Sequence, residues 1–503
     1  MRYFVVAFTL CILGGCGGFF LKDEIMKERS PEFWIKNAQQ DLLKKLTTKL
    51  NLNKAKRMIF FLGDGMSIPT VTAARIYKGQ MDGLDGERDS LSFENFPVLG
   101  LSKTYCVDKQ VADSACSATA YLSGVKANYE TIGVSAHVQK NDCLAAKIEK
   151  NQVESIAAWA QSAGLSTGIV TTTTVTNASP AGTFSHTSNR EFESDFDIRA
   201  ANKSLEHCED IAKQLIFQNP GSNFKVILGG GRANFLPNFT KEGNRLDNLD
   251  LIKHWKSSKK SQANYVTDRE SLLNIDVENT DYLLGLFNKG DLDYHLDSGC
   301  IQPTLEEMTE AAIKILQKNE KGYFLFVEGG LIDRAHHMNL AVKALDETVE
   351  LSKAVQKAVD LTDEKDTLIV VTADHAHVMS MAGYPDRGNL ITGIGTEMSP
   401  IDHLPYMTLS YANGPSSGHY THEGHRDDLR QVNNIGEKNF EFPSLVPMEI
   451  ESHGGDDVAV FARGPWSNLF SGVIEQSDIP HFMAFAGCVG NGLTLCSLDN
   501  DMK

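Results

Sequence analysis

Short apolar runs that alternate with helical patterns are the feature that most constrains how this chain can fold. The clearest helical patterns are 304–318, which opens with the capping box Thr304-x-x-Glu307, and 339–360. Six apolar runs are typical of buried strands: 58–62, 168–170, 226–228, 323–327, 368–371 and 458–461. This alternation predicts an α/β fold, with one large, mostly parallel sheet sandwiched between helices.

One long stretch interrupts the pattern. Between residues 383 and 451 the chain is rich in Gly, Pro, Asn and His, and strand-like sequence resumes only at Val458. Three histidines recur there at every third position: His419, His422 and His425. A solvated loop explains them more simply than a metal site. We expect an α/β domain formed by residues 24–382 and 452–503, with an inserted subdomain at 383–451. A chain of 503 residues is long enough for this arrangement.

The N-terminus has the three parts of a secretory signal. Arg2 is followed by an apolar run and by two glycines, and the run is too short to cross a bilayer, which needs about 20 residues. We expect a signal peptide at about residues 1–18 and a secreted, extracellular protein. The alternative is a lipoprotein anchored through Cys16. The chain ends at 500–503 without an apolar tail, so no C-terminal lipid anchor is expected.

The acidic balance of the chain limits its partners. It has 48 Lys and Arg against 65 Asp and Glu, a formal charge of −17. A general nucleic-acid-binding surface needs basic residues that displace counterions from phosphates, so we expect none here. An anionic substrate would have to be attracted locally, by an arginine or by metal ions.

Acidic residues follow three of the predicted strands. Asp64 follows the first of them, Glu328 the fourth, and Asp374 with His375 the fifth. Because the carboxyl ends of strands line the ligand crevice of an open α/β sheet, these side chains should converge. Clustered carboxylates repel one another unless cations lie among them. Each carboxylate could instead cap a helix, an interpretation that suits one such residue better than several.

Other residues supply further metal-type ligands. Asp333 and His337 are four residues apart, which places both on one face of a helical turn, and His453 precedes the last predicted strand. Imidazole with carboxylate suits Zn²⁺, and three protein ligands leave a position open for water or substrate. Carboxylate with hydroxyl suits Mg²⁺. Surface helices also produce the Asp-x-x-x-His spacing often, so the neighbouring patterns are needed to support a metal site.

Ser114 is a further candidate functional residue. It lies in Asp113-Ser114-Ala115, at the start of a small-residue helix, where free N–H groups and the helix dipole favour an anion. The alternative is that Asp113 or Ser114 only caps the helix. No Gly-x-Ser-x-Gly surrounds Ser114, so its activation would have to come from a metal that lowers the pKa of its hydroxyl.

The cysteines fit an oxidising compartment. Removal of the signal would leave seven, an odd number, so at least one thiol stays unpaired. Cys488 and Cys496 are eight residues apart in a Gly-rich turn, where a local disulfide forms easily. The sequons at Asn202 and Asn238 fit a eukaryotic secretory route.

Taken together, these segments resemble the alkaline phosphatases, in particular the animal type. The resemblance extends from about Lys54 to Cys496. The segments that carry it are Asp113-Ser114-Ala115, Ala178-Ser179-Pro180-Ala181-Gly182-Thr183, Phe326-Val327-Glu328-Gly329-Gly330, Thr372-Ala373-Asp374-His375 and Val458-Ala459-Val460-Phe461-Ala462-Arg463-Gly464-Pro465. Their agreement in this order is highly specific. It implies a metal-dependent enzyme whose substrates are small phosphate monoesters.

The resemblance implies a role for each candidate residue. Ser114 would be the nucleophile that takes the phosphoryl group, and Arg190 would hold its oxygens with a bidentate guanidinium. The implied cofactors are two zinc ions and one magnesium ion. The zinc ligands would be Asp333, His337 and His453 at one ion and Asp64, Asp374 and His375 at the other; the magnesium ligands would be Asp64, Ser179 and Glu328. The implied mechanism uses two zinc ions and a covalent phosphoserine intermediate.

The resemblance also bears on assembly and on the remaining ligands. It implies a homodimer in which the insertion at 383–451 forms a crown near the dimer interface. It further implies disulfides that join Cys143 to Cys208 and Cys488 to Cys496, and it leaves the state of Cys106, Cys116 and Cys300 open. The animal enzymes carry a peripheral calcium ion. Here Asn288 and Gln302 stand where acidic ligands would be expected, which argues against calcium.

Two residues depart from the animal pattern, which usually has histidine at both positions. Arg334 directly follows Asp333, and some bacterial members have a lysine at this place. We therefore expect Arg334 to add a fixed positive charge near the phosphate. The alternative is that it pairs with a surface carboxylate and contributes little. Asn177 lies two residues before Ser179 and could orient a magnesium-bound water.

The leading hypothesis is a secreted phosphomonoesterase with broad substrate tolerance, because nothing in these motifs recognises a leaving group. One alternative is a phosphodiesterase or a sulfatase of the wider superfamily. A sulfatase needs a Cys/Ser-x-Pro-x-Arg context, which Ser114-Ala115-Cys116 does not provide. The other alternative is a binding protein without activity on the same fold. The presence of every residue assigned above to the reaction and its metals argues against it.

Overall fold

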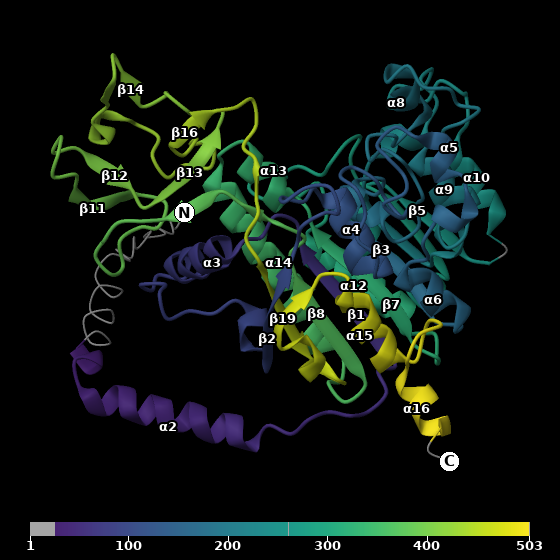
Figure 1. Ribbon diagram of the computed structural model, residues 1–503, viewed down its shortest axis with the longest axis horizontal. Coiled ribbons are helices and arrows are strands. Elements are labelled where there is room, and N and C mark those ends of the chain that lie inside the picture. Colours follow the sequence, from purple (N-terminus) through teal and green to yellow (C-terminus); the bar gives the residue numbers. More distant parts are fainter. Residues whose placement is uncertain (1–25, 260, 502–503) are drawn as a thin grey trace, which may run out of the picture.

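The computed structural model describes residues 26–259 and 261–501. The expected signal peptide at 1–18 lies outside the described residues. Figure 1 shows one large twisted sheet with helices on both sides, a group of small sheets at one end, and the isolated helix α2.

The large sheet has ten strands in the order β19-β2-β18-β8-β1-β7-β3-β4-β6-β5. From one edge to the other these are Gly472–Glu475, Val98–Lys103, Val458–Arg463, Thr367–Thr372, Arg57–Gly63, Tyr323–Gly329, Ser166–Thr174, Val226–Gly230, Tyr282–Leu286 and Ala263–Val266. Of these, β18 alone runs antiparallel to its neighbours. All six predicted strands are present, and the predicted mostly parallel sheet is confirmed.

Helices cover both faces of the sheet, and strand β1 shows why. Ile59 and Phe61 face one core, whereas Met58, Phe60 and Leu62 face the other, because successive side chains of a strand point to opposite faces. Each fully buried side chain of this size contributes about 1.5–3 kcal/mol. The helices that contribute to the first core include α3 (Ile68–Met81), α12 (Leu305–Leu316) and α14 (Ala341–Leu361). Those that contribute to the second include α4 (Ser114–Ser123), α6 (Ile156–Ser162), α9 (Ile211–Phe217), α10 (Leu251–Ser258) and α15 (Asp478–Gly487).

The remaining helices of the domain are short. They are α5 (Cys143–Ala146), α7 (Ala178–Ala181), α8 (Asp195–Ala200), α11 (Arg269–Leu273), α13 (Leu331–His337) and α16 (Leu495–Asp501). Helix α2 (Pro31–Thr47) buries no residue against the described parts of the chain. It lies apart from the rest of the molecule in Figure 1.

Small sheets form a separate group that overlaps the expected insertion at 383–451. One sheet has three strands, β10 (Met379–Met381), β13 (Leu409–Gly414) and β16 (Ser444–Pro447). Two pairs accompany it: β11 (Ile394–Met398) with β12 (Pro405–Met407), and β14 (Thr421–His422) with β15 (His425–Arg426). These strands lie at the upper left of Figure 1, beyond the end of the large sheet.

The chain returns from this group through a short antiparallel pair. Strand β17 (His453–Gly454) pairs with β9 (Ala376–His377), so that His453 lies opposite His377. The pairing brings residues that are about 75 positions apart to the same end of the large sheet. It is the local structure that places His453 among the acidic residues that follow β1 and β8.

Three disulfides join cysteines within residues 26–259 and 261–501. The two implied by the resemblance, Cys143 with Cys208 and Cys488 with Cys496, are present. The third joins Cys106 to Cys116, whose state the sequence left open. Cys300 is free and exposed. The three bonds and the free Cys300 account for the seven cysteines that would follow the signal.

A buried arginine holds the loop that follows β4. Arg245 is 0% exposed, and its guanidinium donates two hydrogen bonds of 2.9 Å to Asp210 and one of 2.7 Å to Asp247. Asp195 Oδ1 lies 3.8 Å from the same guanidinium. Removing one partner of a buried ion pair leaves the others charged and unpaired, which costs about 3–5 kcal/mol.

Arg245→Met should therefore lower the unfolding temperature by several degrees, measured by calorimetry. Arg426→Met is the matched control, because Arg426 makes an equally close ion pair with Asp402 on a half-exposed surface. Exposed pairs contribute about 0–1 kcal/mol. Equal shifts in the two variants would contradict a stabilising role for the buried group.

Candidate metal and phosphate site

The site lies at the carboxyl ends of three adjacent strands. Asp64 follows β1, Glu328 lies near the end of β7, and Asp374 with His375 follows β8. The strands β7, β1 and β8 are neighbours in the sheet, so their ends meet. The structure thus brings together the acidic residues that the sequence pattern predicted to converge.

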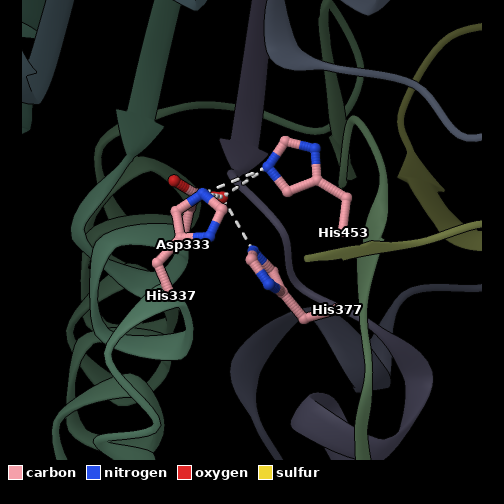
Figure 2. A group of neighbouring side chains, drawn as sticks. All are labelled: Asp333, His337, His377 and His453. Carbon is pink, nitrogen blue, oxygen red and sulfur yellow. Dashed lines mark hydrogen bonds and ion pairs between the residues drawn. The ribbon is translucent and has the colours of Figure 1, made fainter. Parts of the chain in front are cut away.

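A first cluster gathers around a single carboxylate oxygen. Asp333 Oδ1 lies 3.3 Å from His337 Nε2, 3.3 Å from His453 Nε2 and 2.7 Å from His377 Nε2. Figure 2 shows the three imidazoles pointing at this oxygen from helix α13, β9 and β17. The facing nitrogens of His337 and His453 are 3.2 Å apart. Close nitrogens around one carboxylate form a donor set that suits Zn²⁺.

The outer nitrogens of these rings are all engaged. His337 Nδ1 bonds the Glu451 carbonyl at 2.5 Å, and His453 Nδ1 bonds the Ala112 carbonyl at 2.8 Å. A carbonyl can only accept, so each Nδ1 carries the proton and each Nε2 presents its lone pair to the cluster. This arrangement of outer hydrogen bonds is typical of metal-binding histidines.

His377 differs from these two histidines because carboxylates flank both of its nitrogens. Its Nδ1 bonds Glu451 Oε2 at 2.5 Å and its Nε2 bonds Asp333. Burial opposes a charge on this ring, but Glu451 and Asp333 raise the pKa of His377 to about 10. Burial likewise opposes ionisation of Asp333, yet the His337, His377 and His453 rings hold the pKa of its carboxyl well below the usual range. His377 therefore supports Asp333 through a hydrogen bond, and its Nε2 lies in the same group of close ligand atoms as Asp333, His337 and His453.

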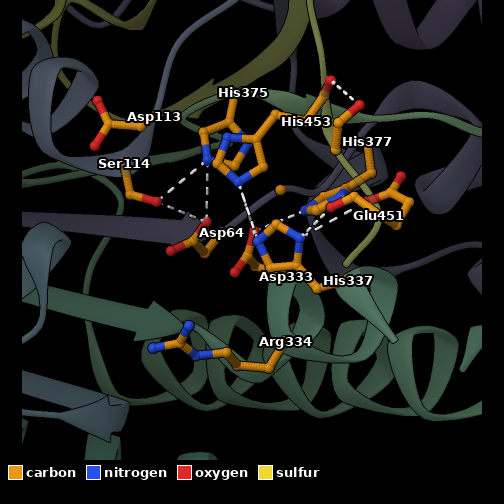
Figure 3. A network of polar contacts seen from close by, with 12 residues as sticks. Asp64, Asp113, Ser114, Asp333, Arg334, His337, His375, His377, Glu451 and His453 are labelled. Atoms are coloured by element: carbon orange, nitrogen blue, oxygen red, sulfur yellow. Dashed lines mark hydrogen bonds and ion pairs between the residues drawn. The ribbon is translucent and has the colours of Figure 1, made fainter. Parts of the chain in front are cut away.

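A second cluster surrounds the Ser114 hydroxyl. Ser114 Oγ lies 3.2 Å from His375 Nε2 and 3.5 Å from Asp64 Oδ1 (Figure 3). His375 Nε2 is also 3.2 Å from Asp374 Oδ2. The rings of His375 and His453 stack with centroids 3.6 Å apart, so the two clusters are in direct contact through these histidines. Ser114 is the first residue of α4, where backbone N–H groups favour an anion.

The carboxylates of the site are crowded as well as buried. Burial, followed by the charges of Asp374, Asp333 and Glu328, raises the pKa of Asp64 well above its usual range. Burial raises the pKa of Glu328 to about 7, although a hydrogen bond from Thr171 opposes the shift. Such groups gain from a bound cation, which would favour their charged forms.

Two orphaned atoms mark a third position. Glu328 Oε2 accepts hydrogen bonds from Thr171 at 2.5 Å and Thr173 at 3.2 Å. Its other oxygen, Oε1, and the Ser179 hydroxyl are buried and have no partner among the described residues. A buried oxygen without a partner costs free energy, whereas a carboxylate with a hydroxyl suits Mg²⁺. The donor sets of all three positions therefore fit the metals that the resemblance implied.

Arg190 lines the entrance to this site. A cavity of about 230 Å³ is lined by Ser114, Arg190 and Arg334, together with Asp333, His337 and His453. Larger cavities of about 530 and 810 Å³ contain none of these residues. The site is therefore identified by the charged, metal-binding and nucleophilic side chains that line the cavity, not by the cavity's volume.

Neighbouring side chains hold Arg190 in place. Its guanidinium donates to Asp113 Oδ2 at 3.1 Å and to Asn177 Oδ1 at 3.4 Å. Asn177 Oδ1 also accepts the Ala178 N–H at 2.6 Å, which caps helix α7. The Asn177 oxygen is thus already used by protein donors, and the water-orienting role considered from the sequence would have to use the amide nitrogen.

Arg334 points across the same cavity. Its Nε donates to Asp291 Oδ2 at 3.2 Å, and its side chain is 40% exposed. Within the described residues, its two terminal nitrogens have no hydrogen-bond partner. Figure 3 shows the guanidinium below Asp64 and Ser114. Arg334 therefore pairs with a carboxylate, as the alternative interpretation expected. Its two terminal nitrogens also stay available as donors to a phosphate, as the first interpretation expected.

The calcium ligands expected from the animal type are replaced by amides that donate. Asn288 Nδ2 donates to the Asp291 carbonyl at 2.7 Å, and Gln302 Nε2 donates to Asp293 at 3.0 Å. These amides lack the negative charge of the acidic ligands, and the expected absence of calcium stays a prediction. In the inserted stretch, the exposed His422 pairs with Asp427 instead of joining a histidine cluster.

Sequence reasoning missed three residues of the site. His377 could have been found, because the alternation in His375-Ala376-His377 places both rings on one side of a short strand. No sequence pattern marks Glu451, because it contacts the His377 ring and lies about 75 residues further along the chain, at the end of the expected insertion. Asp113 was considered only as a helix cap, and it also bonds Arg190.

A serine at a helix N-terminus, beside clustered carboxylates and histidines at the carboxyl edge of a mostly parallel sheet, defines a metal-dependent hydrolase. The family model described as alkaline phosphatase matches residues 55–489. The chain belongs to the alkaline phosphatase family, and it is therefore an enzyme of the phosphoric monoester hydrolase class.

Relatives and solved structures agree with this membership. The chain is 46% identical to a membrane-bound alkaline phosphatase of Bombyx mori, over 93% of this chain and 87% of that protein. It is 44% identical to the human tissue-nonspecific alkaline phosphatase, over 97% of this chain and 94% of that one. The Thermus thermophilus alkaline phosphatase has the same fold at 21% identity, with a TM-score of 0.63 over 90% of this chain and 97% of that chain.

Proposed function

We propose that this chain is a secreted alkaline phosphatase that hydrolyses phosphate monoesters through a phosphorylated Ser114. The observation that carries the proposal is the position of the Ser114 hydroxyl, 3.2 Å from His375 and in one cavity with Arg190. The α4 N-terminus favours the phosphoryl oxygens, and the Arg190 guanidinium can bind two of them in a fork.

Three metal positions follow from the donor sets. We assign zinc to Asp333, His337 and His453 at one position and to Asp64, Asp374 and His375 at the other, and magnesium to Asp64, Ser179 and Glu328. Bound there, the ions would lower the pKa of a coordinated hydroxyl and neutralise charge on the transferring phosphoryl group. The protein itself positions Ser114 for attack, and Asp113 and Asn177 orient Arg190 toward the phosphate.

An assay of one generic phosphate monoester against a diester and a sulfate ester tests this function. We expect kcat/KM for the monoester to exceed the other two by orders of magnitude. Analysis of the same sample should find zinc in twofold excess over magnesium. A preference for the diester or the sulfate ester would contradict the proposal.

Arg334 is proposed as a substrate-binding residue that tightens phosphate binding. Arg334→His should raise the inhibition constant for inorganic phosphate by about 3- to 10-fold, since an exposed charged contact contributes about 1 kcal/mol and 1.4 kcal/mol is tenfold. Turnover should rise if product release limits it. Measurements from neutral to alkaline pH keep the introduced histidine uncharged. Arg334→Lys, which keeps the charge, is the control, and an unchanged constant in Arg334→His would discard the role.

We also propose a homodimer. Helix α2 has Leu42, Leu43 and Leu46 at 55%, 62% and 72% exposure, and it buries none of its residues against the described chain. A second copy would remove this apolar surface from water. Sedimentation equilibrium should give twice the monomer mass, and removal of residues 26–50 should weaken the association.

Secretion is proposed from the N-terminal signal pattern and from the disulfides, which persist in oxidising compartments. Within the described residues, the model contains no helix with the length and apolarity needed to cross a membrane. Asn202 and Asn238 are exposed, as glycosylation would require, whereas Asn177 is buried. Expression of the full chain in a secretory host should release the protein into the medium.

A further inference from the structure

The segment that precedes the nucleophile has no regular structure of its own. Residues 104–113 connect the end of β2 to the start of α4 without a helix or strand. Val107 and Val111, in the middle of this segment, are 55% and 38% exposed. A connection of this kind has many accessible conformations unless other contacts restrict it.

The end of this segment contacts three parts of the site. Asp113 accepts the N–H groups of Ala115 at 3.1 Å and Cys116 at 3.3 Å, which fixes the first turn of α4 behind Ser114. The same carboxylate accepts Arg190 at 3.1 Å. One residue earlier, the Ala112 carbonyl accepts His453 Nδ1. The positions of residues 112 and 113 therefore decide how the phosphate-binding arginine and one metal-binding histidine are oriented.

The disulfide between Cys106 and Cys116 closes this segment into a loop. It joins the start of the segment to the third residue of α4, with Cα atoms 5.8 Å apart. Both cysteines are nearly fully buried, at 3% and 2% exposure, and they pack with Ala112 and Ala127. Three hydrogen bonds to neighbouring residues supplement it: Val107 N–H donates to the Ala127 carbonyl, Tyr129 N–H to Asp108, and Glu130 N–H to Asp113 Oδ1 at 2.9 Å. The disulfide is the covalent tie that limits the movement of residues 107–115.

We infer that the Cys106–Cys116 disulfide is a positioning device for phosphate binding. It holds Asp113, which in turn holds Arg190 in the orientation that binds the phosphoryl oxygens. The inference rests on the proposed function, since it assigns the bond a role at the same site. Without the bond, Asp113 moves more freely, and part of the affinity for phosphate is lost in ordering the segment again.

The test replaces both cysteines by alanine, which suits the small apolar residues around them. We expect Cys106→Ala/Cys116→Ala to raise KM for a monoester and the dissociation constant of inorganic phosphate, measured by calorimetry, by about 3- to 10-fold. Cys488→Ala/Cys496→Ala removes a disulfide of similar loop length near the C-terminus and is the matched control. It should leave both constants within about twofold of wild type at temperatures well below unfolding.

A double-mutant cycle separates positioning from stability. In an Arg190→Ala background, opening the Cys106–Cys116 bond should no longer change the phosphate constant, because the arginine that it positions is gone. A merely structural role would lower the unfolding temperature and the active fraction, but it would not depend on Arg190. An unchanged phosphate constant in the double alanine variant, or the same change without Arg190, would overturn the inference.

Asp113→Asn provides a second variant if the cysteine variant does not fold. Asparagine can still accept the helix N–H groups but has no charge to hold Arg190. The phosphate constant should rise with the disulfide intact, and an unchanged constant would also overturn the inference. Absence of monoester hydrolysis in the wild type would refute the proposed function instead, since phosphate binding is measured without turnover.

Discussion

Replacement of Ser114 by alanine should lower kcat for phosphate monoesters by a factor of about 10³ or more, because a residue that forms the covalent intermediate cannot be bypassed at similar rate. Alanine fits the small, fully buried environment at the start of α4, so the variant should remain folded. The Asp113 side chain still caps the helix in this variant. The loss of activity would therefore report on the hydroxyl itself.

Ser123→Ala is the matched control. Ser123 is the last residue of the same helix, is 3% exposed, and has a hydroxyl without a partner in the described structure. Its removal should change kcat by less than about twofold.

A second measurement identifies the nucleophile directly. Brief incubation of the wild type with labelled phosphate at acidic pH, where hydroxide is scarce, should leave label on the Ser114 peptide. Label on another residue would remove the assignment.

The central part of the fold could be predicted because its strands are buried on both faces. β1, β7, β4 and β8 contain continuous apolar runs, and β3 contains a shorter one at 168–170. In a chain that alternates strands and helices, such runs are typical of strands buried on both faces of a sheet. The strands that escaped prediction, β19, β2, β6 and β5, lie toward the two edges of the sheet. Three of them are partly exposed, so their apolar pattern is weaker.

The part of the site that could be predicted is the part fixed by the order of strands in the sheet. Acidic residues that follow adjacent parallel strands must meet, which the sequence order of Asp64, Glu328 and Asp374 already indicates. His377 and Glu451 were missed because they act on Asp333 through hydrogen bonds rather than through a spacing along the chain. The pairing of Cys106 with Cys116 could not be deduced either, because spacing does not specify connectivity.

Prolonged chelation should abolish activity, by about 100-fold or more, and added Zn²⁺ with Mg²⁺ should restore it. The reason is the charge that the site buries: Asp64, Asp374, Asp333 and Glu328 lie together, and the charge of Arg190 opposes the raised pKa of Asp64 only in part. The carboxylates would hold the metals only in their ionised forms. Ca²⁺ added alone is the control and should not restore activity, since it prefers six to eight oxygen ligands over imidazole.

Metal removal should also make stability depend on pH in a stated direction. In the metal-free protein, the pKa of Glu328 is raised to about 7 and that of His377 to about 10. Both groups bind protons more tightly in the folded state than in the unfolded state, so stability falls as the pH rises from the unfolded to the folded pKa of each group. For Glu328 this fall is nearly complete at about pH 7, whereas for His377 it continues to about pH 10. The unfolding temperature of chelated protein should therefore fall between pH 7 and 9, measured by calorimetry. In the metal-loaded protein the cations would favour the charged form of Glu328 and oppose the charge of the neighbouring His377, so the unfolding temperature should change much less. A chelated protein with full activity, or one whose stability rises over this interval, would contradict the assignment of metals to these residues.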